Sequence, residues 1–93
     1  MPTVIVTADV EDADKWETGF RTHGELFRSQ TVNKPINFTV TELNRAVVLF
    51  EPDDLEEYMQ VLDSPATAEA MDFDGIKRET VKVFVLDKEF DPQ

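Results

Sequence analysis

The chain has 93 residues, the size of one domain, and its twenty acidic and nine basic side chains give a formal net charge of −11. This charge disfavours contact with phosphate backbones and anionic membranes, so we expect no nucleic-acid or membrane partner. The absence of cysteine excludes thiol catalysis, disulfides and cysteine-ligated metals. The length predicts a single domain over residues 1–93. No apolar run is long enough to span a bilayer and the first residues read as a strand instead of a signal peptide, so we expect a cytoplasmic protein.

The first part of the chain predicts a strand followed by a helix. Residues 3–10 are rich in β-branched side chains, as strands are. Asp12 is the expected N-cap of a helix that continues to about Arg28. Its apolar stripe has spacings of four and three residues and comprises Trp16, Phe20, His23 and Phe27. Gly19 and Gly24 border this stripe, and they indicate either close packing on a sheet or room for a ligand.

A hairpin and a second helix are predicted at the centre of the chain. Residues 36–43 and 46–51 have strand composition, and Glu42 to Arg45 supply the turn between them. A helix is expected to open at Pro52 to Asp54. Its apolar positions fall at i, i+3, i+4 and i+7, and they are Leu55, Tyr58, Met59 and Leu62.

The last part predicts a short helix and a final strand. Ser64 is the expected N-cap of this helix, Pro65 its first residue and Gly75 its stop. Residues 77–87 have strand composition, and a polar tail follows. The resulting β-α-β-β-α-β order predicts an α+β, ferredoxin-like antiparallel sheet with the helices on one face.

Apolar side chains fall on both faces of three predicted strands, whereas a sheet with one covered face alternates apolar and polar residues. The last strand has Val81, Val83 and Val85 on one face and Phe84 and Leu86 on the other. Helices cover only one face, so the second face would expose more apolar surface than monomers normally do. We therefore expect a homodimer that pairs sheet to sheet about a two-fold axis.

Three parts of the sequence resemble a known family. They are Val10 to Trp16 with Phe20 and His23, then Arg45 to Glu51 with Asp53 to Glu56, and Ser64-Pro65 with Glu69 to Met71. Here the chain is similar to small bacterial proteins of the dimeric α+β barrel superfamily, near the antibiotic-biosynthesis monooxygenases and EthD-like proteins. The resemblance covers nearly the whole chain and implies a subunit that pairs into a β-barrel dimer. The activities it implies are cofactor-independent oxygenation of aromatic polyketides, haem degradation, and isomerase- or dehydratase-like reactions.

Two departures from the family narrow this implication. Residues 30–37 lack the glycine-centred turn and the Tyr-Arg strand of the family. The resemblance therefore does not predict where the entrance to a pocket lies. A second helical histidine is also missing where a haem ligand would lie, which argues against a haem enzyme. We therefore expect no cofactor.

His23 is the only histidine and the candidate catalytic residue. Histidine ordinarily titrates near neutral pH, which suits a general base. Its place on the apolar stripe directs it to the helix–sheet interface. There it is either a base or hydrogen-bond donor in an apolar pocket, or a core histidine bonded to a backbone carbonyl. The sequence places no carboxylate to orient it, and Thr7, Asp9 and Asn37 are the possible partners in space.

The candidate ligand-binding residues are Trp16, Phe20, Phe27, Asn37, Thr39 and Tyr58. The aromatic members would line a pocket for a small aromatic or apolar ligand, although aromatic residues at helical spacing more often form a plain core. Asn37 and Thr39 share one face of their strand, and we expect them to face the cavity.

Other sites on this fold are disfavoured. The third strand lacks the aromatic motif of RNA-binding modules, and no Cys-x-x-Cys is present for copper. Asp72-Phe73-Asp74 lacks the remaining ligands of a calcium loop, so we expect no metal site. Two hypotheses stay open: a small-molecule-binding protein, as a monooxygenase- or isomerase-like enzyme using His23, and a non-catalytic dimeric structural or protein-interaction module.

Overall fold

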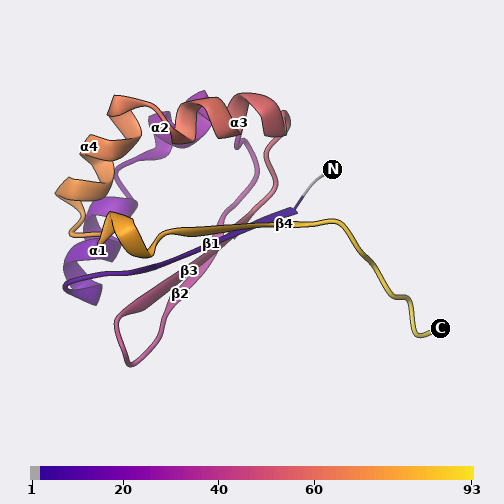
Figure 1. The fold of residues 1–93 in the computed structure, drawn as a ribbon, viewed down its shortest axis with the longest axis horizontal. Helices are drawn as coiled ribbons and strands as arrows, with labels where there is room; N and C mark the ends of the chain where they lie inside the picture. The colour runs from indigo at the N-terminus through magenta and orange to yellow at the C-terminus, as the bar shows by residue number, and fades with distance from the viewer. Residues whose placement is uncertain (1–2) are drawn as a thin grey trace.

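The computed structural model describes residues 3–93 and contains a four-stranded antiparallel sheet with helices on one face (Figure 1). The strands lie in the order β2-β3-β1-β4. Their bounds are β1 (Thr3–Asp9), β2 (Asn37–Val40), β3 (Arg45–Phe50) and β4 (Lys82–Leu86). The predicted ferredoxin-like order is confirmed, although the second and fourth strands are shorter than expected.

Four α-helices and one 3-10 turn complete the described part of the chain. Their bounds are α1 (Ala13–Phe20), α2 (Gly24–Ser29), α3 (Leu55–Leu62), α4 (Pro65–Phe73) and η1 (Arg78–Thr80). Among residues 3–93, none of the helices has the length and apolar character needed to cross a bilayer.

Side-chain caps fix where three of these helices begin. The Asp12 carboxylate accepts the backbone N–H groups of Asp14 and Lys15 at 2.9 and 3.2 Å. Asp54 caps α3, and Ser64 caps α4 with Pro65 as its first residue. These caps satisfy N–H groups that have no partner within the helix, so the predicted starts are confirmed.

The prediction of one helix from Asp12 to Arg28 is wrong, because the chain breaks between α1 and α2. Both the backbone N–H and the hydroxyl of Thr22 donate to the carbonyl of Gly19, at 2.9 and 2.6 Å. The N–H of His23 donates to Phe20 at 3.1 Å, again three residues back. These shorter-range bonds end α1, and a new helix starts at Gly24.

The last strand also starts later than residue 77, because the preceding segment turns. The backbone N–H of Thr80 donates to the carbonyl of Lys77 at 2.9 Å, and that of Val81 to Arg78 at 3.2 Å. In this 3-10 turn the two backbone N–H groups bond locally, so they do not pair with a neighbouring strand.

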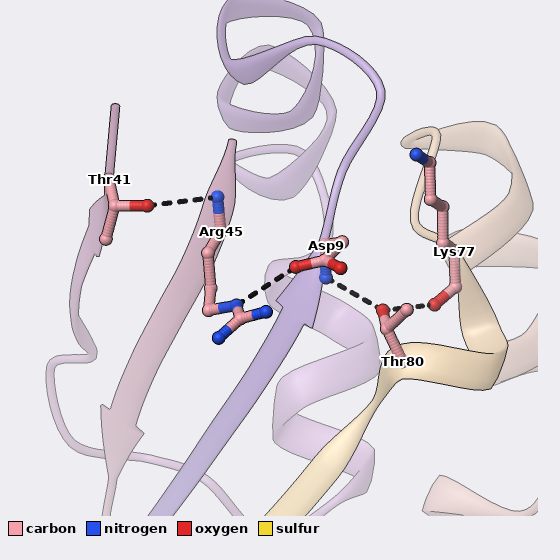
Figure 2. Close-up of polar contacts among 5 residues, drawn as sticks. All are labelled: Asp9, Thr41, Arg45, Lys77 and Thr80. Atoms are coloured by element: carbon pink, nitrogen blue, oxygen red, sulfur yellow. Dashed lines mark hydrogen bonds and ion pairs between the residues drawn. The ribbon is translucent and has the colours of Figure 1, made fainter. Parts of the chain in front are cut away.

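One end of the sheet is closed by polar contacts between strands (Figure 2). Arg45 Nε donates to Asp9 Oδ1 at 3.0 Å, and the Thr80 hydroxyl accepts from the Asp9 backbone N–H at 2.8 Å. The same hydroxyl donates to the Lys77 carbonyl at 2.6 Å, while Thr41 accepts from the backbone N–H of Arg45. These bonds tie η1 to the end of β1.

The core lies between the helices and the inner face of the sheet. Along this face Val6 is opposite Val48 on β3 and Val83 on β4. The largest buried side chains are Trp16, Phe50 and Tyr58, each no more than 2% exposed. Burying a large apolar side chain contributes about 1.5–3 kcal/mol, so these residues dominate the packing between the layers.

The outer face of the sheet is not covered by helices (Figure 1). Its apolar members alternate with the inner-face residues, and they are Ile5, Val47, Leu49, Phe84 and Leu86. Phe84 and Leu86 are each 48% exposed. This outer-face patch is the surface for which the sequence predicts a second copy of the chain.

Candidate functional site

A cavity of about 90 Å³ lies between the helices and the inner face of the sheet. Its wall is almost entirely apolar, with side chains from all four α-helices and from β1 and β3. Five candidate residues line it together: Trp16, Phe20, His23, Phe27 and Tyr58. The structure thus brings these five candidate residues together at one cavity.

Aromatic contacts hold this wall in place. The rings of Trp16 and Phe20 stack with centroids 4.9 Å apart, and Phe20 meets Phe27 edge-on at 5.2 Å. Tyr58 packs against Phe50 at 5.0 Å. Burial raises the pKa of the Tyr58 hydroxyl, so this group stays protonated at neutral pH.

His23 is paired with a carboxylate that the sequence did not indicate. Its Nε2 lies 3.1 Å from Oδ1 and 3.0 Å from Oδ2 of Asp74, at the end of α4. The Asp74 side chain is 4% exposed and that of His23 is 20% exposed. When Nε2 donates to the carboxylate, the neutral ring keeps an unprotonated Nδ1 with its lone pair, which is the arrangement of an oriented general base.

Desolvation dominates the electrostatics of Asp74. Burial raises the pKa of this carboxyl, while the hydrogen bond and charge of His23 and the charge of Lys15 lower it less. Asp74 is therefore a buried carboxyl group whose negative charge is compensated mainly by His23.

Gly19 explains how the Asp74 carboxylate reaches this position. A Cβ built on Gly19 would overlap Asp74 Oδ1 and lie 2.8 Å from its Cγ. Of the two readings that the sequence allowed for the glycines, close packing applies at Gly19. Gly24 differs, because a Cβ there meets only the end of the Arg28 side chain, at 3.4 Å.

Asn37 and Thr39 are not part of the cavity wall. They are opposite Leu49 and Val47 on β3, so they lie on the outer face of the sheet, and both are exposed. They border an open depression beside edge strand β2, together with residues of α1 such as Glu17. Asn37 and Thr39 do share one face of β2, as expected, but it is Phe38 on the opposite face that packs against the core.

The partners considered for His23 are also elsewhere. Thr7 is opposite Val47 and so lies on the outer face, as does Asn37. Asp9 binds Arg45 at the end of the sheet (Figure 2). Among residues 3–93, the His23 ring bonds neither a backbone carbonyl nor any of these three residues, and Asp74 takes their place.

Two geometric observations concern metal and large-cofactor sites. Within residues 3–93, no group of three histidine, cysteine or acidic side chains converges as a metal site would require. The cavity of about 90 Å³ is also smaller than the roughly 300–1,000 Å³ of ordinary small-molecule and cofactor sites.

The sequence matches no protein-family model, and no curated protein matches it. Solved structures do match. SnoaB from Streptomyces nogalater, a cofactor-independent oxygenase, has a TM-score of 0.69 at 15% identity, covering 99% of this chain and 97% of that chain. A protein from Bordetella bronchiseptica named for antibiotic biosynthesis monooxygenase has a TM-score of 0.72 at 14% identity, over 96% and 97%.

This chain has the antibiotic biosynthesis monooxygenase fold. The resemblance drawn from the sequence segments is thereby confirmed for the fold, over nearly the whole chain. A nipsnap family protein of unknown function from Agrobacterium tumefaciens is also similar, with a TM-score of 0.66 at 14% identity over 99% of this chain and 92% of that chain. The monooxygenase fold thus includes an oxygenase by name and a protein without assigned function, and it does not select a reaction.

The polar residues of the cavity wall that sequence reasoning missed include Asp74 and Gln30. Each carries a signal in the sequence. Asp74 ends a helix, where a negative charge is unfavourable with the helix dipole unless a partner compensates it. Gln30 falls three residues after Phe27, so it continues the apolar stripe with a polar side chain. Both are polar side chains where the pattern calls for another type, which is a common mark of a site.

Proposed function

We propose that this chain binds a small molecule in the cavity beside His23 and acts on it as a cofactor-independent monooxygenase- or isomerase-like enzyme. The observation that supports this most is the His23–Asp74 pair at the wall of an otherwise apolar cavity. Asp74 holds Nε2, and Nδ1 then accepts a proton from an ionisable C–H or O–H of the ligand. Loss of that proton leaves an electron-rich anion, which an isomerase reprotonates at another atom and a monooxygenase oxidises with molecular oxygen as the co-substrate.

The apolar wall supports the same proposal. Trp16, Phe20 and Phe27 limit the access of water to the His23 ring, and interactions between charges strengthen where water is excluded. The likeness of the fold to a cofactor-independent oxygenase adds support to this type of reaction.

Filling the cavity tests whether a ligand binds there. Ala70 lines the cavity on α4, whereas Ala66 on the same helix is exposed. Native mass spectrometry of the protein from cells should show a retained small molecule, and Ala70→Leu should lose it while Ala66→Leu keeps it. Retention by Ala70→Leu would contradict the proposal.

We further propose that the working unit is a homodimer joined through the outer-face patch. The patch contains Phe84 and Leu86, each 48% exposed, which is more apolar surface than one face of a monomer normally leaves to water. A second copy covers this face by symmetry. Light scattering at micromolar concentration should give twice the mass of the chain, and a monomer would contradict the dimer.

Location in the cytoplasm stays a prediction from the sequence.

The alternative is a non-catalytic dimeric structural or protein-interaction module, and the small volume of the cavity favours it. Under this alternative the wild-type protein carries no small molecule. Ala70→Leu would then change only stability, by filling empty space in the core.

A further inference from the structure

One buried side-chain polar atom among residues 3–93 has no hydrogen-bond partner, and it belongs to a residue of the cavity wall. Gln30 is 3% exposed, and its Oε1 makes no hydrogen bond. The same side chain lines the cavity that contains His23 and Asp74. Buried polar atoms are nearly always paired, so an unpaired acceptor on a side chain that lines a cavity points to a partner that the described residues do not supply.

Neighbouring bonds fix the orientation of the Gln30 amide. The Thr67 hydroxyl donates its single proton to the carbonyl of Val61 at 2.6 Å. It can therefore only accept from Gln30, whose Nε2 lies 3.4 Å away. Turning the amide over would bring two acceptors together, so Nε2 faces Thr67 and Oε1 is the free acceptor.

The volume of the cavity limits what can meet this acceptor. About 90 Å³ is less than the roughly 150 Å³ of an apolar protein cavity that binds benzene. A single five-membered ring, or a branched chain of similar size, is the appropriate scale. The aromatic wall favours a flat, apolar body, and Gln30 favours one N–H or O–H group on it.

We propose that Gln30 determines ligand specificity, because its Oε1 accepts a hydrogen bond from the N–H or O–H of a compact, otherwise apolar ligand. This inference rests on the proposed binding function and adds the chemical class of the ligand. Gln30 fixes the donor end of the ligand, while the His23–Asp74 pair faces another part of it. A ligand without a donor would leave the buried oxygen unpaired, and such a mismatch discriminates strongly between isosteres.

Pyrrole and furan test this directly, because both are five-membered rings and only pyrrole carries an N–H. Each is titrated into the isotopically labelled full chain, and amide and Trp16 indole signals are followed by NMR. We expect pyrrole to bind at least about tenfold more tightly than furan. Gln30→Met should remove this preference. Gln60→Met, an exposed position on α3, should keep it.

The outcomes separate this inference from the function on which it rests. Equal binding of the two rings by the wild type would overturn the role of Gln30 and leave the cavity as a binding site. Binding of neither ring would overturn both. A preference for pyrrole that survives in Gln30→Met would assign the donor to another group and also refute the inference. The wild-type comparison remains decisive if the variant does not fold.

Discussion

Gly19→Ala is the substitution for which the structure makes the most specific prediction. In an ordinary helix this change stabilises by about 1 kcal/mol, because alanine has the higher helix propensity. Here the added Cβ overlaps the carboxylate of Asp74, whose side chain is only 4% exposed. The carboxylate must move, and its contacts of 3.0 and 3.1 Å with His23 are lost.

The expected magnitude follows from these two opposing effects. Separating a buried carboxylate from its partner destabilises by about 2–4 kcal/mol, and the higher helix propensity returns about 1 kcal/mol. Gly19→Ala should therefore lower the free energy of unfolding by about 1–3 kcal/mol. For a domain of this size the melting temperature should fall by about 5–20 °C.

Urea denaturation followed by circular dichroism measures this difference, and two further variants test its cause. Gly24→Ala should be neutral or stabilising, because its Cβ meets only the flexible end of Arg28. In an Asp74→Ala background the overlap is gone, so Gly19→Ala should stabilise there by about 0.5–1 kcal/mol. A destabilisation by Gly19→Ala that is unchanged in this background would refute the reasoning.

Three other predictions concern the same pair and the outer face. Burial raises the pKa of Asp74 in the folded state. Protonation of this carboxyl therefore favours the folded state at low pH, and this contribution is lost as the pH rises through the pKa of the folded state. Asp74→Asn does not titrate at this position, so its stability relative to the wild type should increase from pH 4 to 7; a constant difference in urea titrations would contradict this. His23→Ala leaves the carboxylate unpaired and should destabilise by about 1–3 kcal/mol, and Asp74→Asn should recover part of this loss; full stability of the single variant in thermal melts would argue that the pair is not coupled. Phe84→Lys should convert the dimer to a folded monomer in light scattering, while Phe73→Lys, which is on α4 and 68% exposed, should not; a dimer in both variants would place the interface elsewhere.

The fold was predictable because local signals agreed with each other. Asp12 and Ser64 cap helices that the apolar spacing also indicates, and the strands have the expected composition. The break after Phe20 was not predictable from spacing, because the stripe runs on through His23 and Phe27 without a change of period. The bonds of Thr22 to Gly19 and of His23 to Phe20 show why α1 ends there.

The candidate site was predictable on the helix side and not across the fold. Trp16, Phe20 and His23 share one face by periodicity alone, and they line the cavity. The pairing of His23 with Asp74 joins positions 51 residues apart, and no local pattern relates them. Asn37 shows the same limit, because alternation gives two faces and does not say which one packs on the helices.

The position of β1 inside the sheet has a consequence for how the chain is made. β1 pairs with β3 on one edge and with β4 on the other, and Val4 is opposite Val85. During synthesis the second edge of β1 stays open until the segment of β4 has emerged, because no earlier strand occupies it. A nascent or truncated chain without Lys82 to Leu86 therefore presents unpaired backbone groups on β1, and such an edge recruits other chains. The last strand of this sheet thus protects the first one from aggregation.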